Sequence, residues 1–166
     1  MFKGQTLKDR AGVDVCLFPM EVIAITQGYM TGTHIDSYNI DLGGSGIGID
    51  PMFTPATSKV VSLSNDGKGN ACVIETLAPV WLEDGTYDYV TVRAVHDNDV
   101  SDLFIGKVLK QGEKWYDEGT SGQATGNHIH FSVAKGKFKG IELSSAGYYK
   151  LIDDVPPETV FFINNT

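Results

Sequence analysis

The sequence has no long apolar run and little helical periodicity. Its apolar stretches fall well short of the roughly 20 residues that a membrane-spanning helix needs, so we expect no insertion into a membrane. Apolar residues rarely recur at helical spacing, and residues 101–105 form the best short helix candidate, about one turn long. The first ten residues lack the apolar core of a secretory signal, which predicts that this chain does not encode its own Sec-type export.

Basic residues and cysteine are also scarce. Thirteen Lys and Arg face 21 Asp and Glu, which gives a formal net charge of −8. Because nucleic-acid binding needs clustered Lys and Arg, we expect no DNA or RNA partner. The two cysteines, Cys16 and Cys72, lie far apart in apolar stretches and lack Cys-x-x-Cys spacing. This arrangement favours buried free thiols over a disulfide.

The pattern that remains is one of strand-forming runs and glycine-rich turns. Strand-like runs occupy residues 13–18, 22–26, 59–63, 71–76 and 87–95. Turn signals separate them at residues 43–46, 65–70, 83–85 and 119–122. Short strands joined in this way predict an all-β fold, an antiparallel sheet, sandwich or barrel with little helix.

The length of 166 residues suits one compact domain, so the sequence predicts a single domain over residues 1–166. The tail, residues 153–166, carries Pro156 and Pro157 and then the apolar run 160–163. We interpret it either as a final edge strand or as the start of a connection to a separate module.

The four histidines are the candidate functional residues. His128 and His130 alternate in a β-like run, so both imidazoles project from one strand face, although this motif alone is a weak signal. His34 is followed by Asp41, which heads a glycine-rich loop, and Asp36 competes with Asp41 as the carboxylate. One histidine, one aspartate and one member of the later pair supply three ligands. Such a set leaves a fourth position open, as catalytic zinc requires.

Three ordered blocks carry a family resemblance. They are residues 26–41 with His34 and Asp41, residues 92–96 ending at His96, and the closing block 119–131 with its Gly-x-(Ser/Thr)-x-Gly and His-x-His elements. Residues 106–113 add a turn of the same family. Over about residues 22–135 the chain resembles the lysostaphin/LytM-type zinc metallopeptidases, especially phage endolysin catalytic domains. The spacing differs at one point, because Asp41 lies seven residues after His34 where the family usually has four. An insertion within residues 34–40 accounts for this, with Asp36 as the alternative.

The resemblance implies a role for each of these residues. It implies a lysostaphin-type fold with long loops around a zinc cleft, in which His34, Asp41 and His130 bind Zn²⁺. It implies that His96 and His128 form a catalytic pair outside the metal shell, with their individual roles left open. Tyr29 precedes His34 as an oxyanion-stabilising tyrosine does in some relatives, and is equally well read as a turn or core residue.

The implied activity is zinc-dependent endopeptidase cleavage of bacterial peptidoglycan peptides, as in a cell-wall lytic, antimicrobial enzyme. We therefore expect action on the bacterial cell wall, by a phage-encoded lysin released through a holin-type membrane lesion or by a shortened form of a longer protein. The alternative is a non-catalytic LytM-like domain that binds the wall or a partner. A metal-binding cupin barrel is disfavoured, because cupins present the His-x-His pair first and here it comes last.

Overall fold

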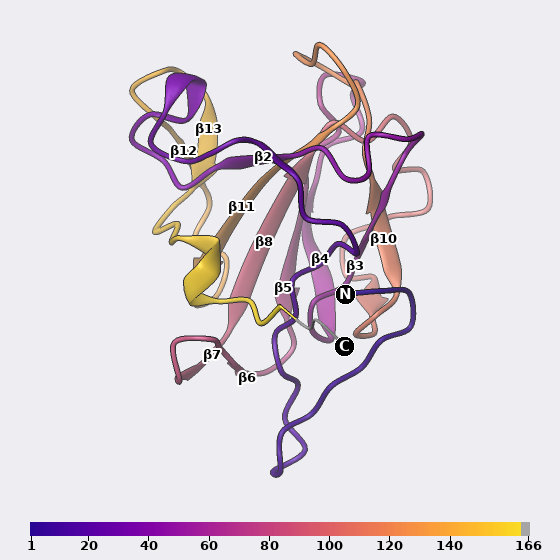
Figure 1. The fold of residues 1–166 in the computed structure, drawn as a ribbon, viewed down its shortest axis with the longest axis vertical. Helices are drawn as coiled ribbons and strands as arrows, with labels where there is room; N and C mark the ends of the chain where they lie inside the picture. Colours follow the sequence, from indigo (N-terminus) through magenta and orange to yellow (C-terminus); the bar gives the residue numbers. More distant parts are fainter. Residues whose placement is uncertain (164–166) are drawn as a thin grey trace.

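The structure is a computed structural model that describes residues 1–163. Its centre is a seven-stranded antiparallel sheet in the order β1-β2-β11-β8-β5-β4-β9 (Figure 1). In that order the strands are Ile25–Gln27, Ile40–Leu42, Ile129–Lys135, Val90–Val95, Cys72–Thr76, Ser58–Leu63 and Val108–Leu109. Three two-stranded ribbons surround it: β3 (Pro51–Phe53) with β10 (Lys114–Asp117), β6 (Val80–Trp81) with β7 (Tyr87–Asp88), and β12 (Ile141–Leu143) with β13 (Tyr149–Leu151).

The prediction of an all-β fold with little helix is confirmed. Every pairing between named strands is antiparallel. Within residues 1–163 the helical elements are two single 3₁₀ turns, η1 (Gly32–His34) and η2 (Pro157–Thr159). None of the described helices is long and apolar enough to cross a membrane.

Alternation along the central strands separates a core face from a polar face. Ile129, Phe131 and Val133 of β11 belong to the main hydrophobic core, together with Ile40 and Leu42 of β2 and Val92 and Ala94 of β8. Successive strand residues point to opposite faces, so the residues between these apolar positions project from the other side of the sheet. Asp41, Arg93 and His130 occupy such positions. The same apolar pattern that builds the core therefore delivers these polar side chains to one surface.

Several expected elements are shorter or different in the structure. The expected strand at residues 13–18 is wrong, because its backbone donors go to four separate segments: Val15 to Leu7, Cys16 to Trp81, Leu17 to Pro55 and Phe18 to Phe162. Only isolated bridges form there. The helix candidate at residues 101–105 is a pair of turns.

The long run 87–95 divides at Tyr89 into β7 and β8, and the run 22–26 yields only β1. In the tail, the expected edge strand over 160–163 is reduced to a single parallel bridge from Phe162 to Leu17. Residues 164–166 of the tail lie outside the described residues. The extent of the domain and the link to a further module stay predictions.

Both cysteines are buried free thiols, as predicted. Burial raises the pKa of Cys72 to about 12 and moves the pKa of Cys16 higher still. Neither thiol is therefore ionised enough to act as a nucleophile near neutral pH.

Candidate metal centre

Three side chains converge on the polar face of the sheet. Asp41 lies in the middle of β2 and is the register partner of His130 in the neighbouring strand β11. His34 closes η1, and its side chain is fully buried. The turn that carries it is tied by the backbone bonds from His34 to Thr31 and from Met30 to both His34 and Ser37. Two ligand candidates thus come from the sheet and one from a tight turn placed over it.

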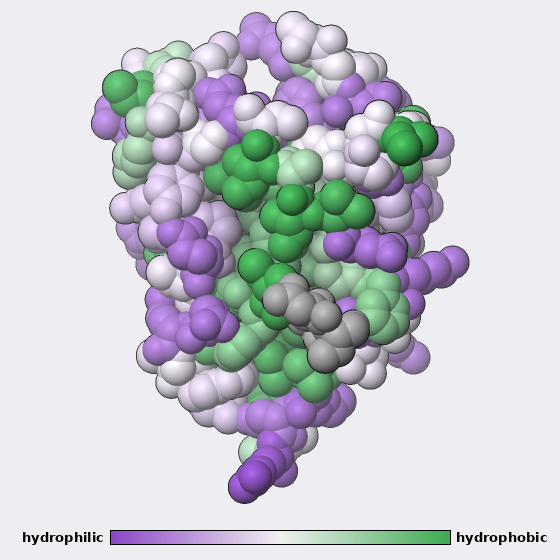
Figure 2. Space-filling view, in the orientation of Figure 1, coloured by the Kyte–Doolittle hydropathy of each residue, from purple (hydrophilic) through white to green (hydrophobic). Residues whose placement is uncertain are grey.

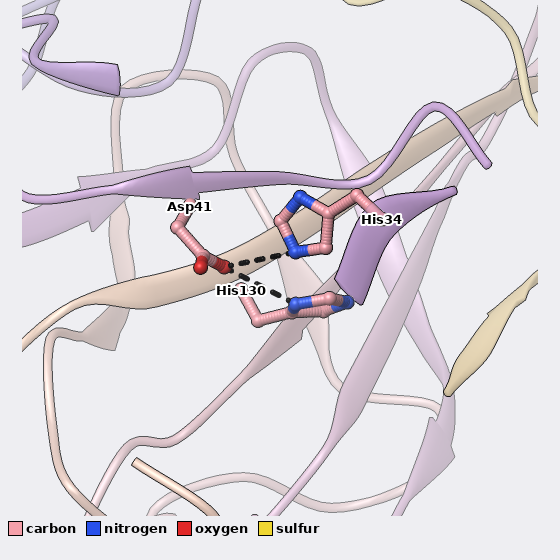
Figure 3. A group of neighbouring side chains, drawn as sticks. All are labelled: His34, Asp41 and His130. Carbon is pink, nitrogen blue, oxygen red and sulfur yellow. Dashed lines mark hydrogen bonds and ion pairs between the residues drawn. The ribbon is translucent and has the colours of Figure 1, made fainter. Parts of the chain in front are cut away.

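The distances suit a small cation (Figure 3). Asp41 Oδ1 lies 3.5 Å from His34 Nε2 and 3.2 Å from His130 Nδ1. One ligand atom from each of the three residues lies within 4.8 Å of the other two. Ligand atoms about 2.0–2.2 Å from a tetrahedral zinc ion are about 3.3–3.6 Å apart, so the two distances to Asp41 are within about 0.1 Å of the edge of such a tetrahedron. The donor set of two imidazoles and one carboxylate fits zinc.

The local electrostatics keep these groups in the protonation states that bind metal. Burial pushes the pKa of Asp41 upward, but the neighbouring imidazoles of His130 and His34 outweigh burial and hold the pKa well below its usual range. Burial lowers the pKa of His130 to about 4, against the opposing effect of Asp41. At neutral pH the centre therefore offers a carboxylate and a neutral imidazole, as metal binding requires.

Hydrogen bonds to backbone carbonyls orient the rings. His34 Nδ1 lies 3.1 Å from the Gly28 carbonyl oxygen. Because a carbonyl oxygen only accepts, Nδ1 must carry the proton, which leaves the lone pair of Nε2 directed at Asp41. Such a bond fixes both tautomer and ring angle in metal-binding histidines.

The two remaining histidines stand beside this centre. The ring centroids of His96 and His128 are 4.5 Å apart, and those of His96 and His130 are 6.2 Å apart. His96 Nδ1 donates to the Ser121 carbonyl at 2.7 Å, and His128 Nδ1 donates to the Gly126 carbonyl at 2.9 Å. Their Nε2 atoms are thereby left as acceptors, and His128 Nε2 lies 3.7 Å from Asp41 Oδ1. Burial lowers the pKa of His96 below its ordinary value, so its ring is neutral near pH 7.

The backbone at His96 is strained. Its φ of 100° lies in the left-handed region, which a histidine enters at a cost of about 1–3 kcal/mol. The conformation is held by bonds from His96 to Gly69 and from Ser121 to His96. Gly119 lies directly against it, because a Cβ at Gly119 would be 2.1 Å from the His96 carbonyl oxygen. Strain of this kind is commonly found at functional sites.

The other two candidate residues, Asp36 and Tyr29, lie away from the point where His34, Asp41 and His130 converge. Asp36 is exposed and hydrogen-bonds to Ser145, so Asp41 and not Asp36 faces His34 and His130. The Tyr29 hydroxyl bonds to Glu158, and its ring stacks edge-on against Tyr38 at 5.2 Å.

Tyr29 lines a separate apolar cavity of about 300 Å³, together with Ile23, Ile25 and Phe161. Apolar surface also gathers in the middle of the face drawn in Figure 2. Of the two interpretations of Tyr29, the structural one agrees with its surroundings.

The histidines open into a cleft of about 820 Å³. Besides the four histidines and Asp41, its lining includes Lys68, Arg93 and Tyr149. Sequence reasoning gave Arg93 no role. The available signal was a charged residue at the centre of the otherwise apolar or small run Val90–Val95, where an ordinary buried strand carries none.

No protein-family model matches the chain. Over 142 residues, 84% of this chain, the sequence is 34% identical to Morphogenesis protein 1 of Bacillus phage B103. The chain spans only 38% of the length of that relative.

Solved structures share the fold at low identity. The catalytic domain of the prophage-encoded M23 protein EnpA from Enterococcus faecalis matches with a TM-score of 0.55 and 18% identity, over 84% of this chain and 92% of that one. A zinc-containing peptidase from Vibrio cholerae matches with a TM-score of 0.52 and 20% identity, over 78% of this chain and 43% of that one. The antimicrobial peptidase lysostaphin from Staphylococcus simulans matches with a TM-score of 0.50 and 20% identity, over 75% of this chain and 50% of that one. The chain has the fold of the lysostaphin/LytM-type metallopeptidases.

Proposed function

We propose that this chain is a zinc-dependent endopeptidase that hydrolyses peptide bonds in bacterial peptidoglycan. The observation that carries the proposal is the convergence of all four histidines and Asp41 on one cleft. The fold is that of known peptidases, and the donor set fits catalytic zinc. In this proposal His34, Asp41 and His130 hold the metal, and His96 and His128 act on the substrate.

The way the side chains are held supports this division of roles. A bound zinc ion would lower the pKa of a water molecule towards 7 and polarise the peptide carbonyl. His34 Nε2, His130 Nδ1 and a carboxylate oxygen of Asp41 would bind it, because these atoms already face one another. His128 and His96 line the same cleft, and backbone carbonyls engage their Nδ1 atoms, which leaves Nε2 for the substrate. One can accept the proton of the attacking water, and the other, once protonated, can donate to the developing oxyanion.

The cellular setting is proposed on narrower support. The match to a phage morphogenesis protein favours a phage-encoded enzyme that reaches the bacterial cell wall, either after a holin-type membrane lesion or as part of a larger phage protein. The substrate would be the stem or cross-bridge peptide of the wall. A lytic, antimicrobial, endolysin-like use follows from the same activity.

The test is direct digestion. Purified cell walls of several cross-bridge types are incubated with the zinc-loaded chain, and new amino and carboxyl termini are identified by mass spectrometry. We expect about one zinc ion per chain, new termini at one type of peptide bond, loss of cleavage on chelation and recovery with added zinc. Stoichiometric zinc without new termini on any wall would instead support the non-catalytic wall-binding alternative.

A further inference from the structure

Arg93 is a buried cation on the wall of the catalytic cleft. It lies in β8 on the polar face of the sheet, with 7% of its surface exposed, and it contributes to the lining of the cleft. Burial lowers the pKa of its guanidinium, although the group stays charged at any ordinary pH. A charge this deeply buried is costly unless hydrogen bonds and an opposite charge accompany it.

Within residues 1–163 Arg93 has almost no such compensation. No carboxylate among these residues lies within 4.0 Å of its guanidinium. Its one hydrogen bond to another group is a long contact of 3.4 Å from Nη1 to the Tyr149 carbonyl oxygen. A guanidinium has five N–H donors, so most of its capacity is unused.

The charges of the cleft are opposite to those of the whole molecule. The chain carries a formal charge of −8, yet the described residues lining the cleft include only one carboxylate, Asp41, which is engaged by His34 and His130. Arg93 and the exposed Lys68 face the same space. A positively charged cleft in a negatively charged protein attracts and concentrates anionic ligands.

Sheet register places Arg93 close to the candidate metal centre. Arg93 pairs with Ser132, and His130 pairs with Val95, so Arg93 and His130 are diagonal neighbours on one sheet face. Such neighbours are about 7–8 Å apart. The charge of Arg93 also adds to the effect of burial in lowering the pKa of His96 and of His130. An extended peptide advances about 3.3–3.6 Å per residue, so this backbone separation between Arg93 and His130 corresponds to roughly two residues of such a peptide.

We propose that Arg93 binds a carboxylate of the peptide substrate, located within about two residues of the bond that is cut. The planar fork of an arginine matches a carboxylate in two parallel hydrogen bonds, which a point charge such as Lys68 does not reproduce. The carboxylate can belong to a side chain or to a free chain end of a wall peptide. This inference rests on the proposed endopeptidase function and narrows its substrate to acidic peptides.

The test compares three synthetic muropeptide fragments of one sequence. The first has free side-chain and terminal carboxylates, the second has the side-chain carboxylate as an amide, and the third has the terminal carboxylate as an amide. Affinity is measured by calorimetry on the chelated chain, where no hydrolysis occurs, and kcat/KM on the zinc-loaded chain. We expect one amide to bind the wild type roughly 10–100-fold more weakly than the free acid, and that amide identifies the carboxylate source. Arg93→Gln should remove this preference and retain zinc.

Three variants control for charge and folding. Arg10→Gln removes the other, exposed arginine, and Lys68→Gln removes an exposed charge from the same cleft. Both should keep most of the preference for the acid. Arg93→Lys keeps the buried charge without the fork and should show a reduced preference even if Arg93→Gln fails to fold.

Equal binding of all three fragments by the wild type, or no binding at all, would overturn the proposal, as would a full preference in Arg93→Gln. Binding that depends on the carboxylate without hydrolysis of any fragment would leave this inference standing and would defeat the proposed endopeptidase function.

Discussion

The candidate ligand trio and the neighbouring histidine pair are built in different ways. Asp41 and His130 are opposite residues of adjacent central strands, and His34 is fully buried above them. His96 and His128 instead lie at strand ends, and each has its Nδ1 held by a carbonyl of the glycine-rich segment 119–126. The trio is therefore positioned by the sheet and by the turn η1 over it, whereas the pair is positioned by a loop.

Because of this difference, replacing a residue of the trio and replacing a residue of the pair should have different effects on metal content and on rate. The trio atoms face one another, so the loss of one removes a ligand from a shared centre. The pair atoms face the cleft, so the loss of one removes a proton acceptor or donor and leaves the centre assembled. The two groups still meet at Asp41, which is 3.2 Å from His130 Nδ1 and 3.7 Å from His128 Nε2. Metal content and rate, measured together, separate the two kinds of role.

The largest effect is expected from breaking the trio. Asp41→Ala, His34→Ala and His130→Ala should each lose both zinc and wall cleavage, the latter by about 10⁴-fold or more, because a three-ligand site does not hold zinc tightly with two. Zinc content by atomic emission and release of new amino termini are the measurements. Asp36→Ala is the matched control and should change neither. Full zinc content in Asp41→Ala would transfer the ligand role to another carboxylate.

Replacing either histidine of the pair should lower the cleavage rate without loss of zinc. His128→Ala and His96→Ala should reduce cleavage by roughly 10²–10⁴-fold while zinc content stays near one per chain, because each removes only general acid–base or oxyanion assistance. Circular dichroism confirms folding. If His128→Ala lost its zinc and His130→Ala kept it, the assignment of the two neighbours would be reversed.

Acid should reduce both metal binding by the trio and proton acceptance by the pair, at a pH lower than that at which free histidine is protonated. A protonated ring neither binds metal nor accepts a proton, so activity should be highest at neutral to mildly alkaline pH and fall by about tenfold per unit in acid. Burial lowers the pKa of His96, and it lowers that of His130 to about 4, so the fall should lie below the ordinary value near 6.5. Cleavage is followed from pH 4 to 9 at constant ionic strength. Undiminished cleavage at pH 4 would contradict a histidine–zinc mechanism.

The smallest effect is expected from a substitution in the glycine-rich segment 119–126, which tests whether this loop positions the histidine pair. Gly119 exchanges backbone hydrogen bonds with His128, and a Cβ there would meet backbone atoms of His96 and Asn98. Gly119→Ala should therefore shift the pair and reduce kcat by about tenfold with zinc retained, since misplaced catalytic groups lose rate steeply. Gly126→Ala is the matched control, because no atom lies within 4 Å of a Cβ at that position. Equal rates in the two variants would mean that the loop does not set the geometry of the pair.

The sequence predicted the fold class, the central strands and the set of candidate residues. Strand-forming runs at 59–63 and 71–76 became β4 and β5, because each also supplies buried residues to the core. The run at 13–18 is also rich in strand formers, but it has no single partner strand, since its backbone donors bond to four different segments. Propensity reports how well a residue fits a strand, whereas a sheet also requires a neighbour in register.

The sequence by itself determined which residues could form a metal centre, because only four histidines exist and two of them alternate on one strand. It left Asp36 and Asp41 as rivals and gave no role to Arg93. Only the tertiary structure showed where these side chains lie. Asp41 faces His130 because β2 pairs with β11 at a sequence separation of 89, and Arg93 reaches the cleft because β8 pairs with the other edge of β11. Contacts between strands distant in sequence depend on sheet register, and a slip of one residue would turn every one of these side chains into the core.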